Sequence, residues 1–277
     1  MKNILALCCL VVTFTSHGQL ESHKGDNGKY GFMDNEKWII QPIYEEVTEF
    51  YDYVVAGVKQ KGKWGFIDRK GNTVLPFVYS RVSYNDESNS TVVMNGKYGM
   101  VSLLKGAEIV KCLYDKPILF DNTTYDKMGI VADVSRNGKA GIINLEGKEI
   151  IPCLYDPASI QQEDTVRLMV KINKKRGMID LKGKQIVPCQ FDLIGINPDN
   201  YVDTTIGKKK GLYSLEGKEI AACVYDNYIV FEEDGFATVQ LNKKTGLMDA
   251  NGKLILPCTY DNDDAMMTDR EKLKKQE

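Results

Sequence analysis

One short phrase built around a glycine recurs along this chain. It reads GKYGF from Gly28, GKWGF from Gly62 and GKAGI from Gly138. Aligned on its second glycine, the phrase occurs seven times, at spacings of 34, 34, 42, 36, 34 and 35 residues: Gly31, Gly65, Gly99, Gly141, Gly177, Gly211 and Gly246. A near-constant period of this length is typical of proteins built from stacked supersecondary units. The sequence therefore predicts seven repeats over residues 28–262.

Each repeat is expected to contain three short β-strands. The first strand alternates apolar and polar residues, as in FATVQLN from Phe236, and a turn such as Asn137-Gly138 leads into the second. The second strand ends in an Asp-x-x-Gly turn, as at Asp68 to Gly71. A third strand follows, and because proline lacks the N–H that pairs strands, we expect five prolines to end it: Pro42, Pro76, Pro152, Pro188 and Pro257.

The best copy of the phrase resembles the WG-repeat family, short β repeats named for a Trp-Gly pair and common in bacterial proteins. The residues that carry the resemblance are Trp64-Gly65-Phe66-Ile67-Asp68, Gly71, Pro76, Tyr79, and the later copies PCLYD from Pro152 and PCTYD from Pro257. The match weakens along the chain, where the Trp position becomes Ala140, Arg176, Lys210 and Thr245. The resemblance implies a β-rich repeat array without assigned catalytic residues.

The ends of the chain bear on whether the array closes into a ring. A closed seven-bladed propeller is the alternative to an open stack, and closure normally uses one blade assembled from both chain ends. QLESHKGDN from Gln19 has no alternating apolar strand, and AMMTDREKLKKQE from Ala265 is typical of a short helical or disordered cap. A propeller blade also has four strands, one more than expected here. We therefore expect an all-β, open, curved or superhelical stack.

A glycine inside a strand usually marks a bulge or the close approach of another group. Each repeat has an aromatic residue about 14 positions after that glycine: Tyr44, Tyr79, Tyr114, Tyr155, Phe191, Tyr225 and Tyr260. We expect the ring to cover the glycine of its own or the next repeat, so that a β-carbon would clash with it. The alternative is that the glycine only permits a local twist.

Five cysteines occupy one position of the repeat: Cys112, Cys153, Cys189, Cys223 and Cys258. Equivalent positions in neighbouring units are expected to lie ~10 Å or more apart, beyond the ~7 Å between Cα atoms that a disulfide can bridge. Buried free thiols are therefore favoured over a disulfide framework. The sequence has no Cys-x-x-Cys pair, so no metal site is expected.

Residues 1–18 are typical of a signal peptide. Lys2 precedes an apolar run from Ile4 to Phe14, and small residues lie just before Gln19. The run is too short to cross a bilayer and no later stretch reaches ~18 apolar residues, so no transmembrane segment is expected. Lipidation at Cys8 is the alternative. We expect export to the periplasm, cell surface or medium, with a polar segment 19–27 and a charged tail 263–277 flanking the repeats.

The sequence does not favour catalysis. Its two histidines, His17 and His23, both precede the repeats, so the repeats have no imidazole to act as base or ligand. Acidic residues are plentiful, but the recurring Asp34, Asp68 and Asp180 are explained by turns. We expect no enzyme activity and no cofactor. The net charge of -2 gives no overall field that attracts nucleic acid.

A lysine stands two positions before each repeat glycine. Five of these residues, here called the lysine column, are candidate ligand contacts: Lys63, Lys97, Lys139, Lys175 and Lys209. Such a column could hold an anionic polymer or the head groups of a membrane surface. The alternative is that lysine at exposed turns only discourages the pairing of sheet edges.

The third interval is longer than the others by about eight residues, around DKPILFDNTTYDKMG from Asp115. The insertion is expected to expose Ile118, Leu119, Phe120 and Tyr125. Insertions in repeat proteins tend to map to loops on the binding face, which makes Phe120 and Tyr125 candidate contacts. The alternative is that these residues fold back onto the core. Taken together, the sequence favours an exported, non-enzymatic protein that binds a protein partner. A structural envelope component, or a binder of anionic glycan or lipid, is the alternative.

Overall fold

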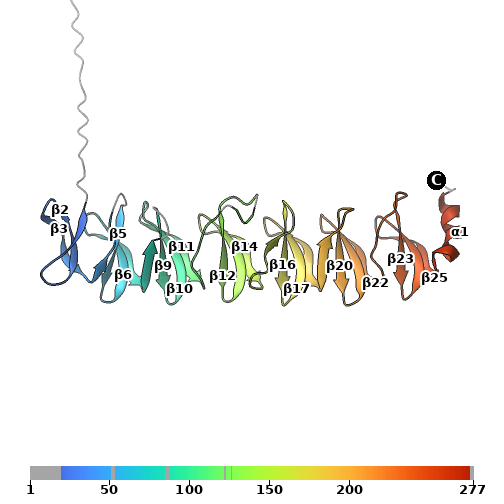
Figure 1. The fold of residues 1–277 in the computed structure, drawn as a ribbon, viewed down its shortest axis with the longest axis horizontal. Helices are drawn as coiled ribbons and strands as arrows, with labels where there is room; N and C mark the ends of the chain where they lie inside the picture. Colours follow the sequence, from blue (N-terminus) through green and yellow to red (C-terminus); the bar gives the residue numbers. More distant parts are fainter. Residues whose placement is uncertain (1–19, 51–53, 85–87, 122, 126, 275–277) are drawn as a thin grey trace, which may run out of the picture. The chain divides into compact units, whose positions relative to one another are not determined.

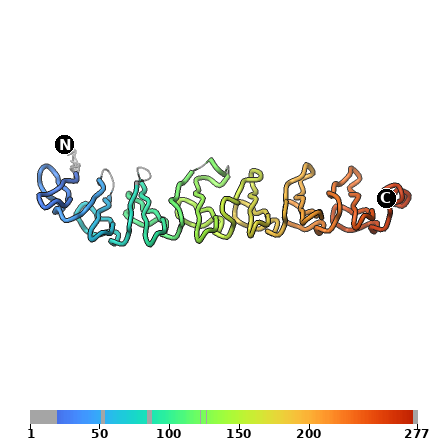
Figure 2. The backbone as a smooth tube through the Cα atoms, turned by 60° about the horizontal axis from the view of Figure 1, so that its bottom comes forward, coloured from blue at the N-terminus to red at the C-terminus, as the bar shows by residue number. Residues whose placement is uncertain are grey.

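The computed structural model describes residues 20–50, 54–84, 88–121, 123–125 and 127–274. The expected signal peptide lies outside the described residues. The chain divides into two compact units, Met1–Cys112 and Leu113–Glu277. Within each unit the repeats follow one another as separate antiparallel meanders (Figures 1 and 2).

The first unit contains three sheets, with strand orders β1-β2-β3, β4-β5-β6-β7 and β8-β9-β10-β11. The strands are β1 (Glu21–Lys24), β2 (Tyr30–Asp34), β3 (Lys37–Tyr44), β4 (Glu46–Val47), β5 (Val55–Gln60), β6 (Lys63–Asp68), β7 (Thr73–Tyr79), β8 (Arg81–Tyr84), β9 (Asn89–Met94), β10 (Lys97–Ser102) and β11 (Ala107–Tyr114), the last of which reaches across the unit boundary.

The second unit contains four sheets, with orders β12-β13-β14, β15-β16-β17-β18, β19-β20-β21-β22 and β23-β24-β25. The elements are β12 (Val131–Arg136), β13 (Lys139–Asn144), β14 (Glu149–Tyr155), β15 (Gln161–Gln162), β16 (Arg167–Ile172), β17 (Lys175–Asp180), β18 (Gln185–Phe191), β19 (Leu193–Ile196), β20 (Tyr201–Ile206), β21 (Lys209–Ser214), β22 (Glu219–Tyr225), β23 (Phe236–Leu241), β24 (Lys244–Asp249), β25 (Leu254–Tyr260) and the helix α1 (Asp263–Lys274).

The all-β repeat array is confirmed, with one sheet for each of the seven predicted repeats. Every sheet of the described residues consists of strands that follow one another in the sequence, so none is assembled from the two chain ends. The last repeat is followed by α1, where the Ala265 amide donates to Asn262 Oδ1 at 2.9 Å. Asn262 therefore caps the helix by accepting from one of its free amides.

Three expectations about strands are wrong. The prolines expected to end the third strand lie inside it, as Pro152 does in β14. Four sheets have a fourth strand, because the short strands β4, β8, β15 and β19 pair with the edge of the following long strand. The first repeat also does not lack its first strand, since β1 pairs in register with β2. These strands have two to four residues, and β1, which reads ESHK, is mostly exposed. An edge strand held by backbone pairing needs no alternating apolar pattern, which is why the sequence did not predict it.

The repeat glycine sits at a β-bulge. Opposite Gly141, the pairing of β13 with β14 shifts register between Ala140 and Ile142. A β-carbon on Gly141 would lie 2.7 Å from the carbonyl oxygen of Ile151 and 2.8 Å from the amide nitrogen of Cys153. The expected role of the aromatic ring is therefore wrong, because the neighbouring strand's backbone, not the ring of Tyr155, excludes a side chain.

The five cysteines of the repeats are free thiols, as predicted. Cys112 and Cys153 are buried, whereas Cys189, Cys223 and Cys258 are half-buried. Sulfur atoms lie over repeat glycines: a β-carbon on Gly177 would be 2.7 Å from Cys189 Sγ. Burial raises the pKa of Cys112 to about 11, with a further increase from Glu108.

The hydrophobic core lies between successive sheets. In one cluster of the second unit, Ile142 and Ile151 of the fourth repeat pack with Leu168 and Val170 of the fifth. A single three- or four-stranded sheet cannot bury both of its faces, so each repeat depends on its neighbour for stability. The face of a sheet that meets the next repeat is therefore where any gap in packing forms a pocket.

Candidate functional site

The lysine column is largely paired with acidic residues. In the second unit Lys139, Lys175 and Lys209 form ion pairs of 2.9, 2.5 and 2.5 Å with the aspartate that follows the aromatic residue of the same repeat: Asp156, Asp192 and Asp226. In the first unit Lys63 is exposed and Lys97 half-buried. The charge of the three paired lysines is balanced locally. A role for the column in binding anions stays a prediction.

The same aspartates also hold the next hairpin. Asp156 accepts hydrogen bonds from the Asn173 and Lys174 amides, at 3.1 and 2.7 Å. The Lys174 bond, followed by the Lys139 ammonium, lowers the pKa of Asp156. This role was not predicted, although an acidic residue follows the aromatic ring in six of seven repeats: Glu45, Asp115, Asp156, Asp192, Asp226 and Asp261.

The insertion before the fourth repeat folds partly into the core. Tyr125 is only 3% exposed, and its hydroxyl donates to Asp133 Oδ1 at 2.8 Å. Phe120 is half-buried. By contrast Leu119 and Ile130 are 72% and 48% exposed, on either side of the bridge between Asp121 and Val131. The insertion therefore contributes one buried polar contact and the exposed apolar side chains Leu119 and Ile130, of which Leu119 was expected to be exposed.

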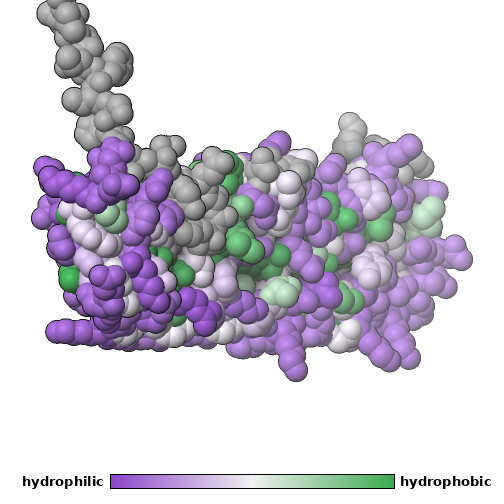
Figure 3. Space-filling model, turned by 60° about the vertical axis from the view of Figure 1, so that its left-hand side comes forward, coloured by the Kyte–Doolittle hydropathy of each residue, from purple (hydrophilic) through white to green (hydrophobic). Residues whose placement is uncertain are grey.

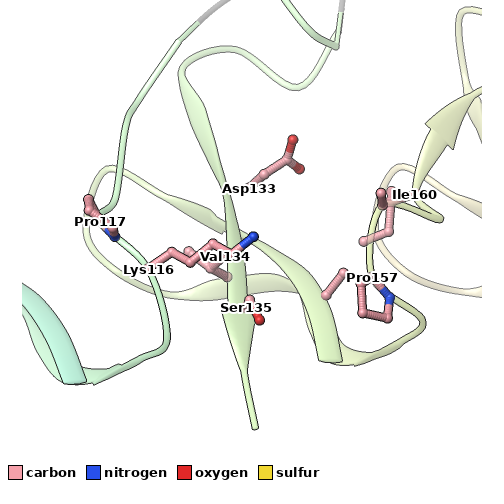
Figure 4. Close-up of a pocket in the computed structure, with 9 residues that line it drawn as sticks. Lys116, Pro117, Asp133, Val134, Ser135, Pro157 and Ile160 are labelled. Carbon is pink, nitrogen blue, oxygen red and sulfur yellow. The ribbon is translucent and has the colours of Figure 1, made fainter. Parts of the chain in front are cut away.

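A pocket of about 220 Å³ lies on the face of the fourth repeat that meets the fifth (Figure 4). Asp133 and Ser135 of β12 and Ala140 of β13 form its floor, and Ser135 and Ala140 are cross-strand partners. Two loops form its walls, and the lining residues that they contribute are Lys116, Pro117, Pro157, Ala158 and Ile160.

Ala140 explains why space is left here. It occupies the Trp position of the repeat, which Trp64 fills in the second repeat. There Trp64 is half-buried and packs against a hydrophobic cluster. Replacing a side chain of this size by a methyl group leaves a gap that the neighbouring backbone does not close. The sequence shows that Ala140 departs from the Trp pattern. It does not show whether another side chain of the fold occupies the space left by the tryptophan.

The carboxylate of Asp133 is the main charged group of the floor. Burial raises its pKa, the hydrogen bond from Tyr125 opposes this increase, and the nearby Asp121 adds to it. Asp133 is nevertheless an exposed residue by its overall accessible surface. It is therefore an ionisable group that is only partly desolvated and open to a partner from outside. Ser135 donates its hydroxyl hydrogen to Asp115 at 3.0 Å, so its oxygen remains able to accept a hydrogen bond.

The pocket combines polar groups on its floor with apolar groups in its walls. Its floor offers a carboxylate and a hydroxyl, and its walls are mostly apolar. Among the residues that the structure describes, no group of three or more His, Cys, Asp or Glu side chains is placed to hold a metal ion. Over the same residues, no helix has both the length and the apolar character needed to cross a membrane.

Comparison with protein families identifies the repeats. The description "WG containing repeat" matches residues 30–64, 64–98, 141–175, 177–209, 211–244 and 246–262, which is more than half of the chain. The chain belongs to the WG-repeat family. The unmatched stretch 99–140 of this WG-repeat protein contains the insertion. It also contains the wall residues Lys116 and Pro117 and the floor strand β12 of the pocket. The sheet β8-β9-β10-β11 shows that the third repeat is present despite the missing match.

None of the curated proteins compared with the WG-repeat protein matches it. Among solved structures it is similar to a eukaryotic initiation factor (10% identity, 85% of this chain and 72% of the other, TM-score 0.27). It is similar to Hsv2 of Kluyveromyces lactis (8%, 79% and 86%, 0.25). It is also similar to the extracellular domain of a hybrid two-component system of B. thetaiotaomicron (10%, 83% and 39%, 0.26).

Proposed function

We propose that this WG-repeat protein is an exported, non-enzymatic binding protein whose ligand is another protein, and that its fourth repeat contacts that ligand. The observation that carries the proposal is the coincidence of a pocket of about 220 Å³ with exposed apolar side chains on one repeat. Leu119 and Ile130 belong to the insertion that also supplies Lys116 and Pro117 to the pocket wall.

Exposed apolar side chains and a pocket on the same repeat favour a protein ligand over a glycan or a nucleic acid. Protein interfaces have an apolar centre and a polar rim, whereas anionic polymers are held mainly by free cationic side chains. Three members of the lysine column already have aspartate partners, which weakens the case for an anionic polymer.

A second apolar feature recurs in both units of the chain. The residue before the aromatic ring is exposed and aliphatic in five repeats: Ile43, Val78, Leu113, Leu154 and Val224. Apolar atoms accordingly reach the surface as small patches among hydrophilic ones (Figure 3). Repeat proteins commonly bind through such repeated positions, while loops set specificity. The insertion is the part of this chain that departs from the repeat.

The absence of catalysis rests on the side chains that the repeats contain. Residues 28–262 include no histidine. The ionisable group in the pocket, Asp133, has a tyrosine hydroxyl as its neighbour rather than a nucleophile paired with a base. Export rests on residues 1–18, and cleavage after Gly18 can be tested by mass spectrometry of the protein recovered from the periplasm and medium.

The binding surface can be tested by photo-crosslinking in the source cells. A photoreactive amino acid at Leu119 should give a discrete crosslinked protein, and the Ile130→Asp substitution should remove that product. The matched control is a photoreactive residue at Leu145, which is also exposed in the fourth repeat but lies in the turn after β13. The proposal is wrong if Leu119 gives no product, or if both positions give the same set of products.

A further inference from the structure

The fourth and sixth repeats share a polar face with a pocket, but they differ in two side chains of that face. The pocket of the sixth repeat has a volume of about 310 Å³, and Asp203, Thr205 and Tyr228 are among its lining residues. Both repeats have an aspartate, and two residues later a hydroxyl side chain, on the strand that precedes the repeat glycine. They differ at the Trp position and at the third residue after the repeat's aromatic ring. The equivalent pairs are Asp133 and Asp203, Ser135 and Thr205, Ala140 and Lys210, and Ala158 and Tyr228.

In the sixth repeat a lysine of the chain itself lies on this face. Lys210 Nζ lies 3.2 Å from Thr205 Oγ1 and 3.1 Å from the hydroxyl of Tyr228. It also lies 4.1 Å from the centre of the Tyr228 ring, a cation–π contact. Burial raises the pKa of Asp203, and the Lys210 charge is one of the groups that oppose this increase. The face therefore carries its own ammonium group.

In the fourth repeat the same face lacks both covering side chains. Alanine stands at both positions, and Ala140 and Ala158 line the pocket. Asp133 and Ser135 are retained on the floor. Across the described residues, Asp133 has no Lys or Arg nitrogen within 4.0 Å, and its side-chain partner is the Tyr125 hydroxyl. The fourth repeat thus keeps the carboxylate and the hydroxyl but has alanine at the position of Lys210, and the cation of its pocket is Lys116 in the wall.

We propose that this pocket binds a lysine side chain of the protein partner, with its ammonium group on Asp133 and Ser135 and its aliphatic stem over Ala140 and Ala158. The inference rests on the proposed function and names the chemistry that the fourth repeat recognises. The volume of about 220 Å³ is below the roughly 300–1,000 Å³ of pockets that enclose drug-sized ligands, and it suits one side chain.

The walls suit the stem of a lysine. Pro117, Pro157 and Ile160 offer apolar contact on both sides of the floor (Figure 4). Lysine commonly lays its methylene groups along such surfaces while its charge reaches a polar partner. Lys116 stands in the wall and its amine is turned toward the pocket, so it opposes a second positive charge there (Figure 4). Shortening it by Lys116→Ala should tighten the binding of a cationic probe.

The test uses Nα-acetyl-lysine methylamide as the probe and the norleucine analogue as its uncharged match. Titration of the isotope-labelled mature protein should shift the backbone NMR signals of residues 133–135 with the lysine probe alone. Asp133→Asn should weaken binding by about tenfold, which corresponds to ~1.4 kcal/mol. Asp203→Asn is the control and should leave binding unchanged. Equal affinity for the two probes, or unchanged binding by Asp133→Asn, would overturn the proposal.

A second variant tests the same idea without a ligand. Ala140→Lys should place the chain's own ammonium over the floor, as Lys210 does in the sixth repeat, and should abolish probe binding. Ala140→Met fills the space without charge. Ala140→Lys should be more thermally stable than Ala140→Met, and Asp133→Asn should remove that difference. A difference that persists with Asp133→Asn would contradict an ammonium–carboxylate contact.

The two proposals can fail separately. Probe binding that survives while crosslinking at Leu119 is absent would overturn the apolar contact surface but support the lysine pocket. Crosslinking at Leu119 without any binding of the lysine probe would overturn the pocket proposal alone.

Discussion

Asp156 accepts a hydrogen bond of 2.7 Å from the backbone amide of Lys174, which joins the end of the fourth repeat to the hairpin turn of the fifth. Lys174 has a φ of 66°, a left-handed conformation that a lysine adopts only when the surroundings favour it. The carboxylate provides that support by satisfying amides in the turn. The acidic residue after the aromatic ring therefore has a structural role, because it links successive repeats.

The first prediction separates the two partners of this acidic residue. Replacing Asp156, Asp192 and Asp226 together by Ala should lower the thermal unfolding midpoint clearly, because each carboxylate also accepts from a backbone amide of the next turn. Replacing Lys139, Lys175 and Lys209 by Ser should change the midpoint little, because exposed ion pairs contribute little to stability. Circular dichroism melts compare the two triple variants. Equal losses would contradict the role in the turn.

The pH dependence of the same variants follows from the direction of the pKa shifts. The pKa values of Asp156, Asp192 and Asp226 are lowered from 3.8 by backbone amides and by their lysine partners, with the lysine as the largest cause at Asp226. A lowered folded-state pKa stabilises the protein above the unfolded value, and this contribution is lost as the pH falls through the folded value. The midpoint difference between the parent and the Ala triple variant should therefore be full at neutral pH and shrink below pH 3.8. A difference that grows in acid would exclude this linkage.

The next prediction concerns the glycine at the bulge. Gly141→Ala should destabilise the protein by about 1–3 kcal/mol, because the new methyl group meets backbone atoms that cannot rotate away. Gly195→Ala is the matched control, since Gly195 also lies in a strand and a β-carbon added there would meet no other atom within 4 Å. Urea denaturation measures both. A loss at Gly195 as large as at Gly141 would argue against the clash.

The thiols give a further prediction. Thiolate is the reactive form of cysteine, and burial raises the pKa of all five repeat cysteines above 9.0. A maleimide should therefore label the native mature protein slowly at neutral pH, with buried Cys112 and Cys153 slowest. All five should react after denaturation without reductant. Mass spectrometry that finds fewer than four labelled sites in denaturant would mean that a disulfide exists.

The repeat pattern predicted most of the fold because it depends on local chemistry. Asn137 and Gly138 have φ values of 53° and 74°, as the predicted hairpin turn requires. The strands that were missed lie at sheet edges, namely β1, β4, β8, β15 and β19. β1 and β4 carry few apolar residues, whereas β19 reads LIGI and was missed because it is only four residues long. Their pairing depends on where the chain enters the sheet. A short stretch of sequence carries no information about that position.

The candidate site was harder to predict for a related reason. Tyr125 was chosen as a surface contact, but its ring is buried and its hydroxyl supports Asp133. The pocket depends on two alanines, Ala140 and Ala158, which come from different parts of the sequence and are ordinary one by one. The significance of these small side chains becomes clear only by comparison with Lys210 and Tyr228, which occupy the equivalent positions of the sixth repeat.

The last prediction concerns the pH dependence of the pocket. Burial is the largest cause of the raised pKa of Asp133. The hydrogen bond from Tyr125 lowers this pKa, and the charge of Asp121 raises it. Lys116 is the cationic residue of the pocket wall. An ammonium probe binds the ionised carboxylate, so its affinity should fall as the pH drops through the raised pKa of Asp133, above the ordinary value of 3.8. By the same linkage, saturating Nα-acetyl-lysine methylamide should lower the pKa of Asp133 in a carbon-detected NMR titration. The carboxyl of Asp203, which already has Lys210 nearby, is the internal control and should not move. If the probe leaves the titration of Asp133 unchanged, or shifts Asp203 equally, the carboxylate is not the ligand of the ammonium group.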